Sequence, residues 1–263
     1  MKLLINMAVC AVLMTSCTKV IDVNLNSVAK KYVIEGYVDN FGGPAQVSIT
    51  QTKDFDENND FPGVSGAEVT ISDNGADAIQ LTESNAGFYE TGKLQGIVGH
   101  TYTLTVKIDG ETFTASSTMP QQVTFDSIFV ENREVFDGTK PVVNVVYQDP
   151  VGKGNGYHFI EYRNNKRTKT IFASSDDFTD GNKITRPLLT FDEEDDEQLK
   201  SGDVVNVVME CIDRPVYKYW YSLDAAAGSG NSATPANPVS NISGGALGYF
   251  SAHTSEVKTI TVP

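Results

Sequence analysis

A cysteine near the start of the chain has the surroundings that most clearly predict a chemical modification. One lysine at position two is followed by a largely apolar run from Leu3 to Met14, and Ser16-Cys17 comes directly after it. This pattern is typical of an export signal, and the run is shorter than the roughly 20 residues that span a membrane. Small residues before a cysteine match the bacterial lipobox, where the signal is cut and the thiol receives diacylglycerol. The sequence therefore predicts a signal peptide over residues 1–16 and lipidation of Cys17; an ordinary secretory signal that leaves this cysteine free is the alternative.

A lipid on this cysteine would hold the protein at a membrane, because each buried methylene contributes about 0.8 kcal/mol. Residues 17–30 would then form a tether to the folded body. Loss of residues 1–16 would change the formal net charge from −14 to −15, since that segment carries one lysine and no acid. Such an acidic chain repels phosphate groups, so neither nucleic acid nor anionic headgroups are expected as partners.

The remaining cysteines, histidines and serines do not form a recognisable catalytic or metal motif. Cys10 would be removed with the signal, and Cys211 lies inside an apolar run, so a disulfide framework is not expected. His100, His158 and His253 lack the paired spacing of zinc sites, and no G-x-S-x-G segment is present. We therefore expect no catalytic residue. A carboxylate pair is defined by its separation in space, so a hydrolase of extracellular polymers remains an alternative.

Two acidic segments offer oxygen ligands for a hard cation. The first has acidic or amide side chains at alternate positions, namely Asp54, Asp56, Asn58 and Asp60. These four are weak calcium candidates, because a helix–loop–helix calcium site would need glycine and glutamate where Asn59 and Ser65 stand. A solvated hairpin tip is the other interpretation. The second segment, Asp192–Glu197, fits the first turn of a helix, where acids complement the helix dipole, with metal capture as the alternative. No other cofactor is expected.

Strand patterns dominate the first half of the chain. Thr101–Ile108 alternates strictly between apolar and polar residues, and Asp109-Gly110 then predicts a two-residue hairpin into Thr112–Thr118. Asn74-Gly75 predicts a second hairpin. Further strands are expected at Lys31–Val38, Gln46–Thr50, Ala67–Ser72 and Ile79–Glu83. Short strands at this spacing predict an Ig-like β-sandwich of about seven strands over residues 31–119.

The pattern restarts after Met119-Pro120, which predicts a second β-rich domain over residues 123–263. Its expected strands are Asp126–Glu131, Val142–Gln148, Tyr157–Tyr162, Thr168–Ala173, Val204–Ile212, Gly248–His253 and Val257–Val262. The fold class predicted for the whole chain is therefore mostly β, with an N-terminal sandwich and a second β-rich domain that contains one short helix.

The short helix is expected to begin after Asp213, which can cap it, with Pro215 in the first turn. Val216 and Trp220 share one face at helical spacing, whereas Tyr219 falls on the opposite face and is expected to be exposed. Exposed aromatic side chains often contact ligands or partners, although a core role for most of these rings is the alternative. The binding candidates are Tyr219, Trp220, Asn241 and Tyr249.

The segment Gly228–Leu247 is too long for an ordinary connection. Proline and paired glycines frame Asn241–Ser243, which favours a fixed turn. We therefore predict that Pro235–Gly245 packs across the second domain with Ile242 buried, and that Ser229–Thr234 stays mobile.

Several short segments, in order along nearly the whole chain, resemble a known family. They are Val33-Ile34-Glu35-Gly36, Gly66-Ala67-Glu68-Val69, Gly87-Phe88-Tyr89, Asp126-Ser127-Ile128, Tyr147-Gln148-Asp149-Pro150, Asn237-Pro238, Ser240-Asn241-Ile242, Gly244-Gly245 and Gly248-Tyr249-Phe250. Together with the lipobox they resemble the Bacteroidota lipoprotein family labelled domain of unknown function 4249 (DUF4249).

This resemblance implies an outer-membrane lipoprotein whose gene often neighbours those of TonB-dependent transporters, with a first domain like the prealbumin-type or carboxypeptidase-regulatory β-sandwich. It assigns no catalytic residue. Surface-exported relatives often carry several acids after the lipidated cysteine, whereas only Asp22 follows closely here, so the side of the membrane stays open. The expected function is a non-catalytic accessory that binds a ligand, a transporter or its partner lipoproteins. A polymer hydrolase and a calcium-stabilised adhesin-like module are the alternatives.

Overall fold

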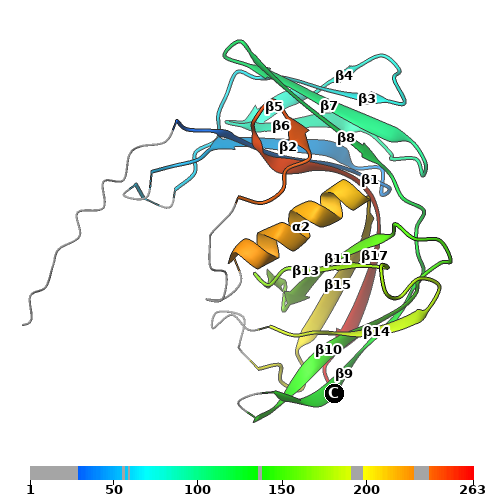
Figure 1. Ribbon diagram of the computed structural model, residues 1–263. Helices are drawn as coiled ribbons and strands as arrows, with labels where there is room; N and C mark the ends of the chain where they lie inside the picture. Colours follow the sequence, from blue (N-terminus) through cyan, green and yellow to red (C-terminus); the bar gives the residue numbers. More distant parts are fainter. Residues whose placement is uncertain (1–28, 55–56, 59, 136–137, 191–197, 228–236) are drawn as a thin grey trace, which may run out of the picture.

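The computed structural model describes residues 29–54, 57–58, 60–135, 138–190, 198–227 and 237–263. These parts are mostly β, as predicted, with helix α2 (Arg214–Ala227) between strands (Figure 1). The strands of the first half are β1 (Tyr32–Asp39), β2 (Pro44–Gln51), β3 (Glu68–Asp73), β4 (Ile79–Gln80), β5 (Thr82–Asn85), β6 (Phe88–Lys93), β7 (Thr101–Ile108) and β8 (Glu111–Thr118). Those of the second half are β9 (Phe125–Val135), β10 (Gly138–Gln148), β11 (Gly156–Arg163), β12 (Lys166–Arg167), β13 (Phe172–Ser175), β14 (Lys183–Leu188), β15 (Val204–Ile212), β16 (Ile242–Ser243) and β17 (Leu247–Thr261).

The two hairpin turns predicted from sequence are confirmed. Asp109 and Gly110 have φ values of 49° and 79°, and Asn74 and Gly75 have 48° and 75°. Positive φ at both central residues matches the right-handed twist of the flanking strands, and asparagine, aspartate and glycine tolerate it best. The first turn joins β7 to β8, which pair from Thr101–Thr118 to Ile108–Glu111.

One large sheet runs through both halves of the chain. Its strand order is β12-β11-β15-β17-β1-β2-β6-β5, and β13 also pairs with β11. The central strand, β17, is 15 residues long and takes the place of the two strands expected at its position. Its first part pairs in parallel with β1, and its remainder pairs antiparallel with β15. The segment 119–124 connects β8 to β9, but β17 joins the two halves into one continuous sheet.

Two smaller sheets cover one face of the large sheet. The sheet β16-β8-β7-β3-β4 encloses the first hydrophobic cluster, in which Ile34 of β1 and Phe250 of β17 are fully buried together with Val106 of β7. The sheet β14-β10-β9 encloses the second cluster, which includes Phe159 of β11 and Val145 of β10. Because side chains alternate along a strand, the residues between these core positions face the other side of the large sheet.

Helix α2 lies against that other face, in the hollow of the bent sheet (Figure 1). The predicted cap is confirmed, since Oδ1 of Asp213 accepts a hydrogen bond from the backbone N–H of Val216 at 3.1 Å. The other carboxylate oxygen accepts from the Ser117 hydroxyl at 2.8 Å and the Thr118 N–H at 3.0 Å. One aspartate therefore begins the helix and also fixes it to β8.

The prediction that Tyr219 is exposed is wrong. Its side chain is only 5% exposed, because its ring packs on Tyr249 of β17 with centroids 4.8 Å apart. Tyr219 stands three residues after Val216 and four before Leu223, so at helical spacing it belongs to the buried face of α2 and not to the opposite one.

The prediction for the late loop is confirmed in one respect and wrong in another. Ile242 is buried, at 7% exposed. Its strand, however, pairs with Ala115 of β8, so the segment packs on the first sandwich and not across the second domain. The physical reason is that β17, the strand after this loop, pairs with β1. This pairing places the loop beside the first hydrophobic cluster. Residues 228–236, which include the expected mobile stretch, lie outside the described residues.

Candidate functional site

A pocket of about 290 Å³ opens on the helix-bearing face of the large sheet. Strands β1, β11, β15 and β17 supply its floor, and α2 supplies one wall. The lining residues are Tyr37, Asp39, Phe41, His158, Ile160, Tyr162, Arg167, Val208, Glu210, Trp220, Tyr249, Ser251, His253 and Ser255. The volume lies just below the range of about 300–1,000 Å³ that is usual for ligand sites, and aromatic walls with a few polar groups are typical of such sites. We call this hollow the aromatic pocket.

A largely buried carboxylate, 14% exposed, lies between two imidazoles at the centre of the aromatic pocket. Glu210 Oε2 lies 2.8 Å from Nδ1 of His158, and Oε1 lies 3.6 Å from Nε2 of His253. Burial alone would raise the pKa of Glu210, but the imidazoles of His253 and His158 outweigh it and lower the pKa to about 2. The carboxylate is therefore ionised at neutral pH and accepts a hydrogen bond from His158.

This lowered pKa predicts a loss of stability in acid. An unfolded glutamate has a pKa of about 4.3, so Glu210 contributes stability above about pH 5 that is lost as the pH falls towards 2. Between about pH 5 and 2.5, the free energy of unfolding should fall by on the order of 2 kcal/mol more in the wild type than in Glu210→Gln. Urea titrations at a series of pH values measure this difference. The control Glu68→Gln changes an exposed carboxylate and should follow the wild type; parallel curves for wild type and Glu210→Gln would refute the assignment.

Aromatic rings form the walls around this carboxylate. Trp220 stacks on His158 at 4.1 Å between centroids, and Tyr249 lies 4.9 Å from Trp220 with the ring planes at 56°. The ring of Tyr37 lies 5.7 Å from that of His253. Burial, followed by the nearby carboxylates of Glu210 and Glu35, raises the pKa of Tyr249, so its phenol stays a hydrogen-bond donor.

Two further charged residues stand beside the rings. Glu35 pairs with Tyr249 across β1 and β17, on the same face as Tyr37. The side chain is exposed, yet surrounding protein desolvates the carboxylate and raises its pKa, and the Arg167 guanidinium opposes this shift. An exposed group that is still desolvated is typical of the wall of a hollow.

Four binding candidates came from the sequence, and the structure gives them different places. Trp220 and Tyr249 line the aromatic pocket. Tyr219 supports the ring of Tyr249 from behind. The amide of Asn241 donates to the carbonyl of Phe250 at 2.8 Å and accepts from its N–H at 3.0 Å, which fixes the late loop to β17. The structure therefore brings two candidates into the pocket and gives the other two supporting contacts.

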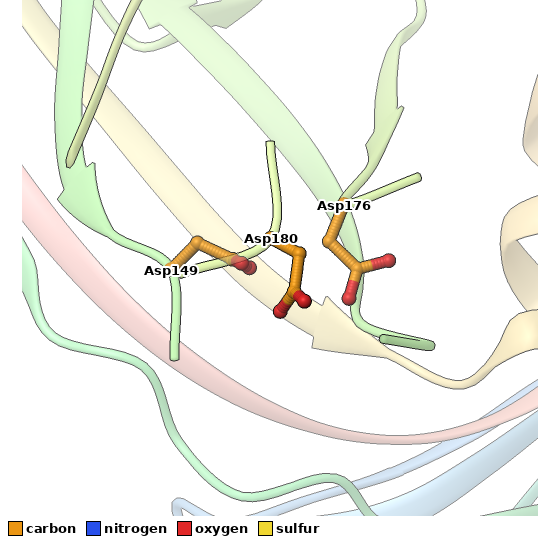
Figure 2. A group of neighbouring side chains, drawn as sticks. All are labelled: Asp149, Asp176 and Asp180. Atoms are coloured by element: carbon orange, nitrogen blue, oxygen red, sulfur yellow. The ribbon is translucent and has the colours of Figure 1, made fainter. Parts of the chain in front are cut away.

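A cluster of three carboxylates lies at the end of β10 and in the loop after β13 (Figure 2). Asp149, Asp176 and Asp180 offer oxygens within 4.8 Å of one another, and this chemistry could hold a calcium ion. The same oxygens, however, already accept hydrogen bonds from protein donors. Asp149 accepts from the Tyr157 hydroxyl and the Gly181 N–H.

The other two carboxylates of this cluster are satisfied in the same way. Asp176 accepts from the backbone N–H groups of Gly154 and Asn155 at 2.8 and 3.0 Å, and Asp180 accepts from Gly152 at 2.7 Å. Backbone donors stabilise buried carboxylates by replacing their lost hydration. The cluster therefore ties the loop after β10 to the loop after β13.

The acidic segments singled out in the sequence are not part of this cluster. Of the four calcium candidates, Asp56 lies outside the described residues, and so does the run Asp192–Glu197. In the described part, Asn58 accepts a hydrogen bond from Nζ of Lys53 at 2.8 Å. Among the described residues, neither Asp54 nor Asp60 belongs to a group of three acidic, histidine or cysteine side chains that lie close enough to share an ion.

Sequence reasoning missed the central group of the pocket. His158 and His253 are far apart in the sequence and give no sign of contact there. Strand pairing brings both of them next to β15 in the folded protein. One signal was present: Glu210 is the single charged residue in the apolar strand Val204–Ile212. A carboxylate in such a run needs partners in the folded state, and histidines on neighbouring strands are suitable ones.

The fold and the pocket define a mostly β protein whose bent central sheet carries a ligand-sized, aromatic hollow. By sequence, the chain belongs to the family described as a domain of unknown function (DUF4249), whose model matches residues 18–259. No curated protein matches the chain. Among the described residues, the helix found is neither long nor apolar enough to cross a membrane.

Proposed function

We propose that the chain is a non-catalytic lipoprotein of the outer membrane that binds a small ligand in the aromatic pocket, as an accessory of a TonB-dependent nutrient-uptake system. The aromatic pocket is the observation that carries the ligand-binding part. Side chains from four strands and a helix converge there, and many of them are polar or aromatic. The core does not need such groups, and burying them costs free energy, whereas a ligand site uses them for orientation and specificity.

The membrane part of the proposal rests on the lipobox and on the family resemblance. Cys17 lies outside the described residues, and the first strand begins at Tyr32. Fifteen residues of chain reach roughly 50 Å at full extension. A lipid on Cys17 would therefore keep the pocket close to a transporter in the same membrane, which suits a protein that presents or receives a ligand.

Lipidation has a direct test. In its own host, the wild type should incorporate an alkyne-labelled fatty acid and enter the detergent phase on Triton X-114 partition, whereas Cys17→Ser should do neither. The acyl chains supply the affinity for detergent, and only the thiol can accept them. An unlabelled, water-soluble wild type would instead support the ordinary secretory signal.

Ligand binding is tested on protein purified from its own membrane without denaturation. Native mass spectrometry should find a small molecule on the wild type and on Val204→Phe, but not on Val208→Phe. Val208 lines the pocket, whereas Val204 faces the same side of β15 outside it, so the two variants differ only in whether the new ring fills the hollow. Crosslinked membranes should also yield the transporter or its partner lipoproteins. Absence of both a ligand and a stable protein partner would contradict the proposal.

A hydrolase is the second candidate, because one contact in the pocket favours it. The Ser251 hydroxyl lies 3.0 Å from Nδ1 of His253, whose other nitrogen faces Glu210. This order of hydroxyl, imidazole and carboxylate is the order of a catalytic triad. Two facts weigh against it: Ser251 is only 2% exposed, and the N–H of the next residue, Ala252, donates to the Ser117 hydroxyl at 2.8 Å and is not free to bind an oxyanion.

Ester cleavage separates the two candidates. The binding proposal expects no hydrolysis of p-nitrophenyl acetate or butyrate above the rate of a Ser251→Ala variant. Turnover by the wild type that Ser251→Ala and His253→Ala both abolish would replace the binding proposal with the hydrolase.

A further inference from the structure

Several polar side chains of the aromatic pocket have no partner within the described part of the protein, although buried polar groups are normally hydrogen-bonded. Two of them are at least nine-tenths buried, since Trp220 is 9% and Ser255 is 4% exposed. Among the described residues, no hydrogen bond or ion pair is made by the side chains of five lining residues, namely Tyr162, Arg167, Trp220, Tyr249 and Ser255. Their partners must therefore come from the content of the hollow, either water or a ligand.

The polar groups of the pocket differ in what they require of a ligand. The indole N–H of Trp220 and the guanidinium of Arg167 can only donate hydrogen bonds, so they require acceptor oxygens. The carboxylate of Asp39 can only accept. Its Oδ1 accepts from the N–H of Phe41 at 2.9 Å, and its Oδ2 has no partner in the described part of the chain. Hydroxyl groups on a ligand meet both requirements, because each of them donates and accepts.

The charges of the lining nearly cancel, whichever protonation states the two histidines have. Asp39 and Glu210 are acidic, Arg167 is basic, and His158 and His253 together add between zero and two positive charges. The net charge of the lining therefore lies between −1 and +1. Such a lining attracts neither a cation nor an anion strongly. An uncharged ligand can be bound in all of these states, and it loses less hydration on entry than an ion does.

The rings of the pocket require apolar surface on the same ligand. Trp220 and Tyr249 lie 4.9 Å apart with their planes at 56°, so they form a corner into which a ring can pack. Phe41 lines the same hollow although it is 61% exposed, so a ligand would cover apolar surface there. A volume of about 290 Å³ suits one small ring and not a long chain. A sugar ring combines this size with hydroxyl groups at its edge and apolar C–H groups on its faces.

We propose that the aromatic pocket binds a single uncharged sugar ring, a neutral monosaccharide. This inference rests on the proposed function, because it names the ligand class of the same pocket. Trp220 and Tyr249 pack on the C–H groups of the sugar. Asp39 accepts hydrogen bonds from its hydroxyl groups, and Arg167 donates hydrogen bonds to its oxygens.

Tryptophan fluorescence measures binding directly, because Trp220 is the only tryptophan of the chain. The probes are three neutral hexoses, D-glucose, D-galactose and D-mannose. Cyclohexanol is the control probe, since it keeps an apolar six-membered ring but carries a single hydroxyl group. At least one hexose should change the emission saturably. Cyclohexanol should bind at least tenfold more weakly, because it forms fewer hydrogen bonds with the lining.

Two pairs of variants test the groups assigned to the sugar. Arg167→Met keeps the aliphatic stem and removes the guanidinium, so it should weaken hexose binding by about tenfold. Its control is Lys166→Met, which removes a positive charge from the same strand, β12, outside the lining. Tyr162→Phe removes one hydroxyl group and should weaken binding by about three- to tenfold. Its control is Tyr221→Phe, at a side chain that is 60% exposed and does not line the pocket. Both controls should bind as the wild type does.

The outcomes that overturn the inference are separate from those that overturn the proposed function. No response to any of the three hexoses would exclude a monosaccharide site, and so would cyclohexanol binding as tightly as the best hexose. Equal weakening by Arg167→Met and Lys166→Met would do the same. A response to acetate, choline or glycine without one to a hexose would show that the ligand is charged. In each case, ligand retention by the native protein still decides whether the pocket binds a small molecule.

Discussion

Gly248→Ala should lower the free energy of unfolding by more than about 3 kcal/mol, because alanine fits neither the backbone conformation nor the space at this position. Gly248 has a φ of +96°, which side-chain-bearing residues rarely adopt. A Cβ added there would lie 2.0 Å from the carbonyl oxygen of Ile34. That oxygen belongs to β1, directly across the parallel pairing that joins the two halves of the large sheet.

The variant Gly245→Ala is the matched control for this prediction. Gly245 also has a positive φ, of +92°, but a Cβ there would meet no atom within 4 Å. It should therefore lose only about 1–2 kcal/mol, the cost of the backbone conformation. Urea unfolding measures both variants. Equal midpoints for the two would show that the close approach of β17 to β1 is not required.

Ile242→Ala should lower the free energy of unfolding by about 2–4 kcal/mol, the usual cost of truncating a buried aliphatic side chain. The side chain enters the first hydrophobic cluster from the short strand β16, beside Ala115 of β8. Val239→Ala is the control in the same loop. Val239 is 56% exposed, so its truncation should cost less than about 0.5 kcal/mol. A melting temperature unchanged in Ile242→Ala would mean that the loop does not stabilise the sandwich.

Local features of the fold could be read from the sequence because their causes are local. The Asp109-Gly110 turn, the alternation of β7 and the Asp213 cap each depend on residues close together in the chain. The strands β6 and β14 were missed. Glycine and threonine interrupt the apolar pattern of β6, and Pro187 stands inside β14, which lies at the edge of its sheet, where proline is tolerated.

The site was mostly beyond sequence reasoning because its geometry depends on long-range pairing. The register of β17 against both β1 and β15 brings Tyr37, Glu210 and His253 to one face, and nothing local in the chain sets that register. Trp220 and Tyr249 could be predicted as site residues because aromatic side chains often contact ligands, whichever element carries them. The burial of Tyr219, by contrast, follows from local spacing, because the residue shares the helix face of Val216 and Leu223.

The central claim is that the aromatic pocket holds a small ligand, and an experimental structure of the protein purified from its own membrane tests it most directly. The account predicts well-ordered, non-protein density in the aromatic pocket, against Trp220, Tyr249 and Tyr37. A pocket that contains only water, in a preparation whose mass spectrum shows no bound molecule or whose ligand lies elsewhere on the protein, would contradict it.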